Sequence, residues 1–584
     1  MPAKPSGKIK TSRVNVKQKN GDIYVMERQT LYDPVKKYNK IVSSKLIAKI
    51  PKGEKIEVPT RPKRPNGSKL PTKPLNVSAS RKRVGMMDII EHIGSISGID
   101  AAIYASTDTG TAQKIISLAR YLLATNGQTF PGIQTWQYTH PLPYVNGISE
   151  DVYHALFHDI GLDESLQQNF FRKRCSLLGD HGAIAYDSTT ISTYSGQQPE
   201  ARYGYNKAKD GMKTVKLLTL YSIENRQPVA FTKQPGNLPD VSSIENALKQ
   251  LSVLGIDHAE IVTDNGYYSE PNLSEMLQKG FGFVTLAKTN IKWIRPEIEA
   301  HIEELSSIHS VCPFDPATHG VTVLLMHDFE KVRKYASHKS GAEKGAVETF
   351  RRRVYLHIYF NASRQAEDRI AFETDLMELK SIIEDGTPIE ELSRSAQEKV
   401  KKYLSINTWG KKTTVRFKDK ACQEAYKYHG YFTLVSNREK DCHECLKIYR
   451  KRETIESYFE AEKEHADGSR IRVWSPDTLR GRMFVQFISL CYYEYFSEQL
   501  RKIKPTLGKQ NKDNIRTKEM IDLEEKLLSW MENTPVYLQL QWFDTVEEVK
   551  VSSELRNKRW NTEVTARDAL YLEKLGMSLR TKHF

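Results

Sequence analysis

Cysteine is scarce in this chain. Its 584 residues include six cysteines, and their spacing lacks the paired pattern that builds a disulfide framework. An apolar segment typical of a secretion signal is lacking as well. These absences predict a protein that works in a reducing, cytoplasmic environment. Cys442 and Cys445 form one Cys-x-x-Cys pair, but a single pair is weak evidence for zinc, and its role stays open.

Long apolar runs are lacking too. The longest, Phe484–Phe496, is too short and too polar to span a bilayer, which takes about 20 apolar residues. It predicts a buried helix instead, and we expect no membrane partner.

Positive charge, in contrast, is abundant in one place. The chain holds 87 Lys and Arg against 72 Asp and Glu, a net charge of +15. Residues 1–85 contain 22 basic and 5 acidic residues, so they carry the whole excess and the rest sums to about −2. Such a segment favours an electrostatic DNA-binding region. The alternative is a solubilising basic tail.

The basic region changes character along the chain. Residues 1–20 are polar and basic without periodicity, which predicts a disordered tail. Residues 21–83 combine alternating apolar runs, such as Ile41–Ile50, with a Pro-rich basic linker. They predict a small β-rich DNA-binding module whose linker lies along a phosphate backbone. The linker residues expected to touch DNA are Arg61, Lys63 and Arg64.

A tetrad of polar residues at helical spacing is the most informative motif. Tyr449, Arg452, Glu456 and Lys463 are separated by 3, 4 and 7 residues. At about 100° per residue they fall within one sector of about 60° on a helix. A carboxylate flanked by cations suits metal-assisted chemistry on a nucleic-acid backbone. The alternative is a solvated charged face.

Two aspartates upstream follow strand-like runs. Asp187 closes the short buried run Gly182–Tyr186, and Asp264 follows Ala259–Thr263. Carboxylates at strand ends lie at a sheet edge, where rigid strands can aim them at one metal. For each aspartate alone, a turn or helix-cap role is the alternative.

The tetrad matches the Y-x2-R-x3-E-x6-K signature, and with the two aspartates the chain resembles the DDE transposases of the insertion-sequence-four superfamily. The resemblance implies an α/β, RNase H-like catalytic core with Asp187 on its first strand, Asp264 after its fourth and Glu456 on a later helix. It implies that these three carboxylates are catalytic and hold two Mg2+ ions, with Mn2+ as a substitute. Tyr449, Arg452 and Lys463 would contact DNA.

The resemblance covers roughly residues 180–500. Tyr203–Lys207 and Pro235–Asn237 with Asp240 also look like family positions. The chain departs from the family where Lys463 is flanked by Glu462 and Glu464. Repulsion between these carboxylates and phosphate is expected to weaken a DNA contact at Lys463.

Three carboxylates suit phosphoryl transfer. Mg2+ takes oxygen ligands, and two ions about 3.5–4 Å apart can activate the attacking oxygen and stabilise the leaving one. Water as the attacker gives strand cleavage, and a DNA 3′-hydroxyl gives strand transfer.

The length of the chain predicts several domains. Glu456 lies 192 positions after Asp264, a separation that exceeds what the core needs and predicts an insertion. Trp409 in this insertion is a candidate for stacking on a displaced base, with burial in a core as the alternative. Beyond the basic region we expect an α-helical domain at 84–176, the first part of the core at 177–288, a β-rich and helical insertion at 289–429, the second part of the core at 430–505 and a helical C-terminal region at 506–584.

The predicted function is that of a DNA transposase that cleaves and joins the ends of its own insertion sequence. Its partners would be double-stranded DNA with terminal inverted repeats, target DNA and a second copy of the chain on paired ends, at the nucleoid of a prokaryote. The alternatives are an RNase H-like nuclease and a non-catalytic DNA-binding protein derived from a transposase. The intact set of three carboxylates argues against the second alternative.

Overall fold

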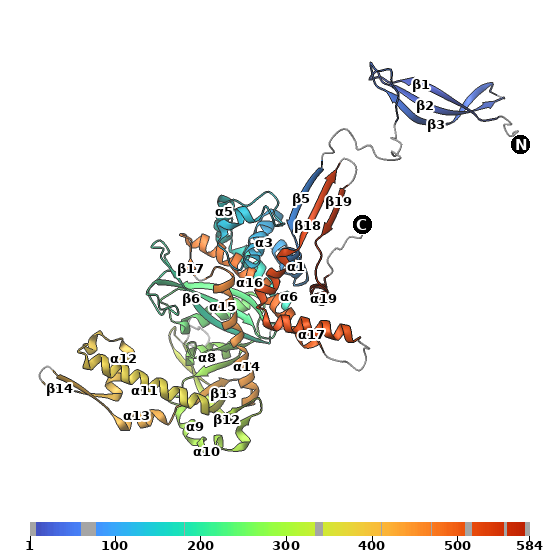
Figure 1. The fold of residues 1–584 in the computed structure, drawn as a ribbon. Coiled ribbons are helices and arrows are strands. Elements are labelled where there is room, and N and C mark those ends of the chain that lie inside the picture. Colours follow the sequence, from blue (N-terminus) through green and yellow to red (C-terminus); the bar gives the residue numbers. More distant parts are fainter. Residues whose placement is uncertain are drawn as a thin grey trace. The chain divides into compact units, whose positions relative to one another are not determined.

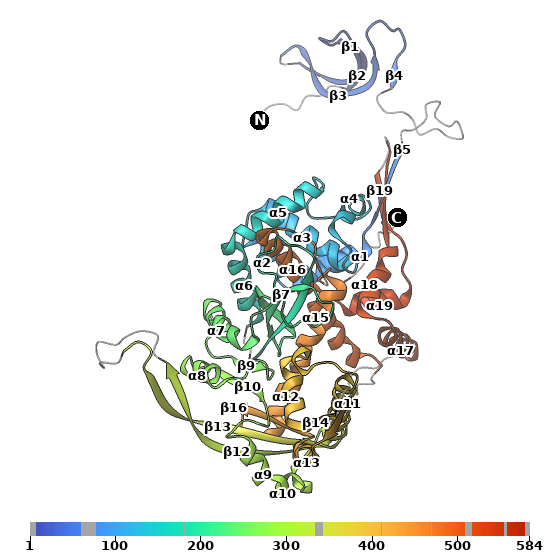
Figure 2. The same ribbon diagram turned by 90° about the vertical axis from the view of Figure 1, so that its left-hand side faces the viewer.

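The protein divides into two compact units in the computed structural model, drawn in Figures 1 and 2. One unit comprises Met1–Ser78 with Ser552–Asn557, and the other comprises Ala79–Val551 with Lys558–Phe584. The structure describes residues 8–34, 36–59, 77–179, 182–332, 343–409, 412–468, 470–508, 517–553 and 557–577. Arg61, Lys63 and Arg64 lie outside these residues.

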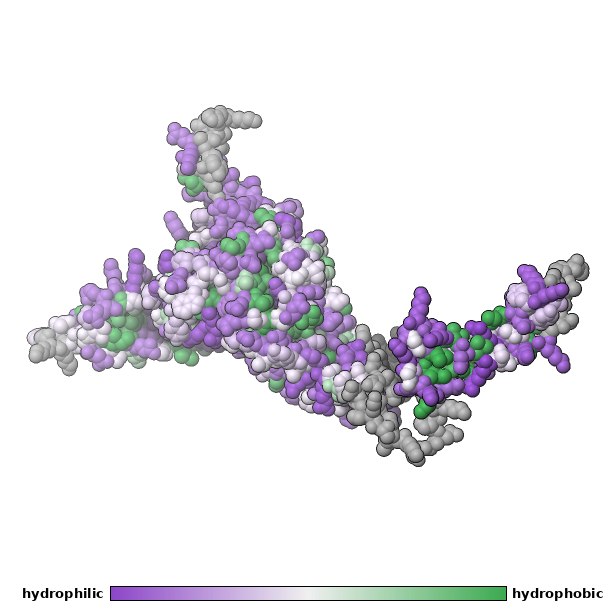
Figure 3. Space-filling model, turned by 90° about the horizontal axis from the view of Figure 1, so that it is seen from above, coloured by the Kyte–Doolittle hydropathy of each residue, from purple (hydrophilic) through white to green (hydrophobic). Residues whose placement is uncertain are grey.

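The N-terminal unit contains an antiparallel four-stranded sheet. Its strands, in spatial order, are β1 (Lys10–Lys17), β2 (Ile23–Asp33), β3 (Tyr38–Ile50) and β4 (Val58–Pro59). The first strand lies within residues 1–20, so the disordered tail predicted there is wrong for Lys10–Lys17, which pair with β2. Val25 and Ala48 face each other across β2 and β3 and are buried. Other apolar side chains stay exposed, among them Ile41 and Val42. Figure 3 shows apolar surface on this unit, at the right of the view, between hydrophilic side chains.

Among the described residues, the centre of the larger unit is a mixed sheet of ten strands. In spatial order it contains β11 (Val311–Cys312), β12 (Asp315–Val332), β13 (Val347–Asn361), β16 (Tyr431–Ser436), β10 (Gly282–Ala287), β9 (Glu260–Thr263), β6 (Ala183–Thr193), β7 (Lys213–Ser222) and β8 (Gln227–Pro235). The tenth strand, β17 (Arg470–Ile471), pairs with the end of β6. Strands β6, β9 and β10 run parallel, and the other main neighbours are antiparallel.

Helices cover both faces of this sheet. Because side chains alternate along a strand, Ile184 and Tyr186 of β6 face one hydrophobic core, and Ala183 and Ala185 face the other. The first core includes α1 (Gly85–Ile96), α2 (Ile99–Tyr104), α3 (Thr109–Ala124), α4 (Ile133–Trp136), α5 (Glu150–Leu162), α6 (Glu164–Leu178), α7 (Ile244–Val253), α8 (Glu270–Gln278) and most of α16 (Pro476–Ile503). The second includes α14 (Cys442–Lys451) and α15 (Glu453–His465).

Several predicted elements are confirmed. The helices expected within 84–176 are present as α1, α3 and α5, and the buried helix expected at Phe484–Phe496 is the centre of α16. Among the residues that the structure describes, no helix combines the length and the apolar character needed to cross a membrane. All six cysteines are buried and free.

The expected insertion is not one separate domain, because part of it belongs to the main sheet. Its long hairpin β12–β13 joins the main sheet through the pairing of β13 with β16, which covers an edge that would otherwise be open. Helices α9 (Arg295–Ala300) and α10 (Ile302–Leu305) precede this hairpin. The rest forms a small core of its own from α11 (Ala362–Glu384), α12 (Arg394–Tyr403), β14 (Leu404–Trp409), β15 (Lys412–Phe417) and α13 (Asp419–Tyr426).

Trp409 ends strand β14 and is 92% exposed. Burial in a core, the alternative weighed for this residue, is therefore wrong. The C-terminal region contains the helices α17 (Lys518–Asn533), α18 (Val536–Trp542) and α19 (Ala566–Lys574). It also contains two strands that the sequence did not predict, β18 (Glu547–Ser553) and β19 (Asn557–Asn561), in a small sheet with β5 (Val77–Arg83).

A close crossing of α5 and α16 generates a stability prediction. A Cβ atom at Gly481 would lie 1.9 Å from the Phe157 carbonyl oxygen, and one at Gly161 would lie 1.9 Å from that of Asp477. We expect Gly481→Ala to lower the free energy of unfolding by about 3 kcal/mol, because backbone atoms would have to move apart. Urea denaturation measures this loss. Gly196→Ala is the matched control, since nothing lies within 4 Å of its Cβ position, and an equal effect of both variants would refute the crossing.

Candidate active site

Asp187 lies in the middle of β6 rather than at its end. The sequence predicted a strand that stops before Asp187, but β6 continues to Thr193. The reason is that the Ser- and Thr-rich segment after Asp187 pairs with β7 along its whole length, with Asp187 opposite Thr219. β-Branched threonines suit such a strand.

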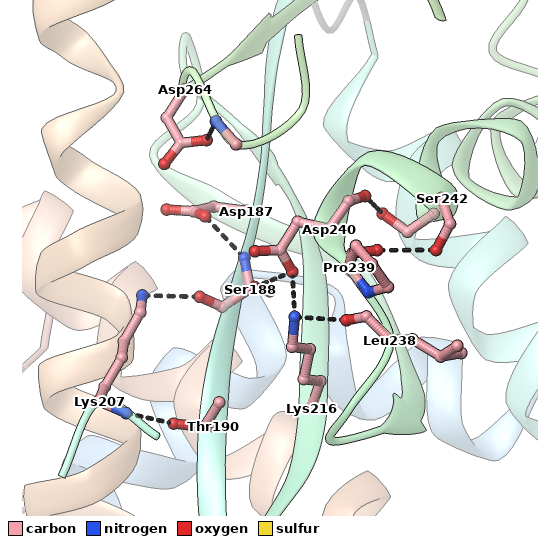
Figure 4. Close-up of polar contacts among 12 residues, drawn as sticks. Asp187, Ser188, Thr190, Lys207, Lys216, Leu238, Pro239, Asp240, Ser242 and Asp264 are labelled. Carbon is pink, nitrogen blue, oxygen red and sulfur yellow. Dashed lines mark hydrogen bonds and ion pairs between the residues drawn. The ribbon is translucent and has the colours of Figure 1, made fainter. Parts of the chain in front are cut away.

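Asp264 follows β9 directly, as predicted, and the strand register places it beside Asp187. Ala185 of β6 pairs with Val262 of the parallel strand β9, and both aspartates lie two residues further along. Side chains two residues apart share a face of the sheet. Since Ala185 and Val262 face the core that α14 and α15 cover, both carboxylates project toward that side. Figure 4 shows the two side chains near each other.

Arg452 interrupts the helix that the sequence predicted for the tetrad. Helix α14 ends at Lys451 and α15 begins at Glu453, so Tyr449 and Glu456 lie on two consecutive helices. The amide of Ile455 donates to the Arg452 carbonyl, which makes a tighter turn than an α-helix at this point. The expectation of one uninterrupted helix is therefore wrong.

The Arg452 side chain connects two of the predicted catalytic carboxylates. Its Nη1 lies 2.9 Å from Asp187 Oδ2, and its Nη2 lies 2.7 Å from Glu456 Oε1. The Arg452 side chain is 10% exposed and that of Glu456 is 55% exposed. Glu456 lies in the first turn of α15, where the helix dipole favours a negative charge.

Burial dominates the electrostatics of Asp187. The pKa of Asp187 is raised to about 6, mainly by removal from water and also by the charge of Asp264. The guanidinium of Arg452 and the ammonium of Lys207 act in the opposite direction. A divalent cation would favour the ionised form of such a carboxylate in the same way.

Tyr449 joins this cluster, and Lys463 does not. The Arg452 guanidinium lies 5.5 Å from the centre of the Tyr449 ring, and burial raises the pKa of the Tyr449 hydroxyl. Lys463 lies at the end of α15, and no contact among the described residues links it to the other three. Burial raises the pKa of the Glu462 carboxyl to about 8 and keeps it mainly neutral, which reduces the repulsion expected from this residue, whereas Glu464 is 72% exposed.

Sequence reasoning missed a polar network behind Asp187 (Figure 4). Asp240 Oδ1 accepts hydrogen bonds from Ser188 Oγ at 2.9 Å and from Lys216 Nζ at 2.7 Å. Lys207 Nζ donates to the Ser188 carbonyl at 2.8 Å. These contacts fix the residue next to Asp187. Asp240 and Lys207 belong to segments that resemble family positions, whereas no sequence signal marked Lys216.

No three His, Cys, Asp or Glu side chains of the described part of the chain are grouped to hold a metal ion. Arg452 pairs with both Asp187 and Glu456. The three carboxylates nevertheless supply only oxygen donors, the ligands that Mg2+ prefers. Asp187 and Asp264 already influence each other electrostatically, so the donor chemistry fits a hard cation.

A cavity of about 690 Å³ opens beside this cluster. Asn265, the neighbour of Asp264, lines it together with cations and aromatic rings of the insertion. These include Arg295, Arg364, Lys402, Phe372 and Tyr428. The lining also contains Glu424 and Asp368, which pair with Arg295 and Arg364, so Lys288 and Lys402 supply its excess of positive charge.

A comparison with protein families agrees with the DDE transposase part of the resemblance. The family described as "Transposase DDE domain" matches residues 178–492, a span that includes all three carboxylates. A comparison with curated proteins found no match. Among solved structures, piggyBac transposase in a synaptic complex with hairpin DNA is similar with a TM-score of 0.32 and 12% identity, over 78% of each chain.

The paired contacts of Arg452 generate a prediction about pH. The raised pKa of Asp187 means that the folded protein holds this proton more tightly than the unfolded one, so stability falls as pH rises from about 3.8 to about 6. In Arg452→Met, the pKa of Asp187 rises further because its partner is gone. The loss of unfolding free energy relative to wild type should therefore be larger at pH 8 than at pH 5, by about 1–3 kcal/mol.

Urea denaturation at both pH values checks this difference. Arg450→Met is the control two residues earlier, in the last turn of α14, because Arg450 pairs with Asp315 instead. Its effect should be equal at pH 5 and pH 8. If Arg452→Met also loses the same stability at both pH values, Arg452 does not govern the ionisation of Asp187.

Proposed function

The chain belongs to the transposases with a DDE domain, and on this premise we propose that it cleaves and joins DNA at the ends of its own insertion sequence. We assign it to the insertion-sequence-four superfamily because Tyr449, Arg452, Glu456 and Lys463 keep the spacing of that signature. We further assign an RNase H-like core to residues 177–288 and 430–505. The order β8-β7-β6-β9-β10 supports this assignment, with Asp187 on the first of these strands along the chain and Asp264 after the fourth.

One observation carries the proposal. Asp187 on β6 and Asp264 directly after β9 each lie two residues beyond the paired Ala185 and Val262, and Arg452 ties Asp187 to Glu456. Three carboxylates that lie far apart in the sequence thus gather on one face of the sheet. A buried carboxylate with a raised pKa, next to another carboxylate, is typical of a functional site.

Asp187, Asp264 and Glu456 would hold two Mg2+ ions, for which Mn2+ can substitute. The ions would activate the attacking oxygen and stabilise the leaving oxygen of a phosphodiester. Arg452 has a separate role in this proposal. Its guanidinium neutralises Asp187 and Glu456 before DNA arrives, and it then binds a phosphate oxygen of the DNA through the same two N–H groups.

Other residues position the DNA. Tyr449 and Lys463 would orient phosphates next to the scissile bond, and the cations around the 690 Å³ cavity would hold the adjoining strand. Trp409, exposed at the end of β14, is available to stack on a displaced base. The basic N-terminal unit and its linker would bind double-stranded DNA at the terminal repeats.

We also propose that two copies assemble on paired DNA ends, because joining two ends needs two active sites and twofold symmetry is the commonest solution. Target DNA would be the second DNA partner. The proposed setting is the nucleoid of a prokaryotic cytoplasm. A nuclease of the same core would cleave but not join, so a strand-transfer assay with a pre-cleaved 3′-hydroxyl end decides between the two.

Glu456→Gln tests the catalytic role directly. The amide keeps the size of the side chain and loses the charge that would hold a metal. We expect the variant to bind end-containing DNA nearly normally and to cleave it at least a hundredfold more slowly. Glu460→Gln, an exposed carboxylate on the same helix, is the control and should cleave normally. Cleavage by Glu456→Gln within tenfold of wild type would remove Glu456 from the catalytic set.

The N-terminal unit is tested by a chain that begins at Ala79, where the larger unit starts. We expect weaker DNA binding and a shallower dependence of affinity on salt, since each lost phosphate contact removes about 0.9 from the slope of log K against log salt. Filter binding over a range of salt concentrations measures this slope. An unchanged slope would mean that DNA is held elsewhere.

A further inference from the structure

Four large aromatic side chains are exposed near the end of β6, beyond Asp187. Their exposed fractions are 79% for Tyr194, 70% for Tyr203, 73% for Tyr205 and 66% for Trp474. Rings of this size usually bury most of their area. We call this group, with the cations around it, the aromatic patch.

Contacts between the segments show that the rings share one region. Tyr194 follows β6 directly, and Arg470 of β17, which pairs with Ser192 of β6, lies over the Tyr194 ring at 5.0 Å. Lys213 of β7 pairs with Thr193 and lies 5.5 Å from the centre of the Tyr203 ring.

Trp474 is tied to the same region through its neighbours. Gln198 Nε2 donates to the carbonyl oxygens of Val473 and Ser475, both at 3.0 Å. The backbone on both sides of Trp474 is thereby held against the loop that follows Tyr194.

The loop with Tyr203 and Tyr205 is held in place on its inner side. A Cβ atom at Gly204 would lie 2.4 Å from the Gly236 carbonyl oxygen, so only glycine allows this approach. Arg202 and Thr214 exchange two backbone hydrogen bonds, and the Lys207 amide donates to Thr190 Oγ1 at 3.1 Å. Tyr203 and Tyr205 flank the packed glycine, and both point their exposed rings at solvent.

The patch is positively charged and connects to the active site. Residues 194–213 and 470–474 contain six basic and two acidic residues. The acidic ones are engaged, because Glu200 pairs with Lys233 and Asp210 accepts from Asn206. Lys207 reaches from this loop to the Ser188 carbonyl next to Asp187. Tyr194 lies seven residues after Asp187, roughly 23 Å along the strand.

We propose that the aromatic patch binds unpaired DNA that continues from the phosphate held at the carboxylates. Exposed rings interleaved with cations are how proteins bind single strands, because each base can stack on a ring while cations follow the backbone. In a duplex the base faces are already stacked, so rings of this kind would find no partner. This inference rests on the proposed function for its substrate, and it adds a second contact region to the same reaction.

Binding in the presence of EDTA tests the patch without catalysis. The full-length protein is titrated into a fluorescein-labelled 15-nucleotide oligo(dT) and into a duplex of the same length, and anisotropy is recorded. Salt of about 0.3 M weakens the electrostatic contribution of the basic N-terminal unit. We expect the double variant Tyr203→Ala, Tyr205→Ala to bind the single strand at least tenfold more weakly and the duplex within twofold of wild type.

Two controls sharpen the outcome. The double variant Tyr203→Phe, Tyr205→Phe should bind the single strand as wild type does, since stacking needs the ring and not the hydroxyl. Tyr138→Ala, which removes a ring that is 75% exposed outside the patch, should also change nothing. Unchanged single-strand affinity in the Ala variant, an equal loss in the Phe variant, or an equal loss on duplex would each overturn the proposal.

Photo-crosslinking gives a readout that does not depend on any variant. Oligonucleotides with 5-bromouracil are irradiated with the wild-type protein, and the adducts are mapped by mass spectrometry. Adducts at Tyr194, Tyr203, Tyr205 or Trp474 support the patch, and adducts found only elsewhere refute it. If the wild-type protein binds oligo(dT) but shows no metal-dependent cleavage of DNA, that result counts against the proposed function and leaves the patch standing.

Discussion

The guanidinium of Arg452 makes two contacts on which the candidate site depends. It joins Asp187, on a strand of the central sheet, to Glu456, on a helix more than 260 residues later in the chain. A buried carboxylate without a partner is costly, and here a second carboxylate, Asp264, adds to that cost. Arg452 offsets part of it in the state that the structure describes. The same guanidinium pairs with the Glu456 carboxylate, so one cation balances charge on two of the three carboxylates.

The sheet supplies the other half of this geometry. The parallel pairing of β6 with β9 has one fixed register, which determines how Asp187 and Asp264 lie relative to each other. A slip of either strand by one residue would turn its carboxylate to the opposite face of the sheet. Helix α16 stabilises this arrangement from the other side, where most of its residues are buried. The crossing at Gly161 and Gly481 brings α16 so close to α5 that the N-terminal helices and the sheet share one hydrophobic core.

The sequence predicted the elements of the core well because each has a strong local pattern. Strand β9 and helices α1, α3, α5 and α16 lie where the sequence predicted them. The failures involve partners distant in sequence. Strand β6 extends past Asp187 because β7 pairs with it, and the hairpin β12–β13 belongs to the main sheet because β16 offers an edge. Helical spacing grouped the tetrad correctly around Tyr449, Arg452 and Glu456, but it could not reveal the turn at Arg452 or the neutral state of buried Glu462.

The polar network of Asp240, Lys216 and Ser188 involves residues that the sequence marked weakly or not at all. Lys216 is buried on β7 and its ammonium has the Asp240 carboxylate and the Leu238 carbonyl as partners. This network holds one side of Ser188, and Lys207 holds the other through the Ser188 carbonyl. Lys207 comes from the loop that also presents Tyr203 and Tyr205. The position of the backbone at Asp187 is therefore coupled to the loop that carries Tyr203 and Tyr205, and a DNA strand bound at the aromatic patch would act on the same segment of β6 that orients the Asp187 carboxylate.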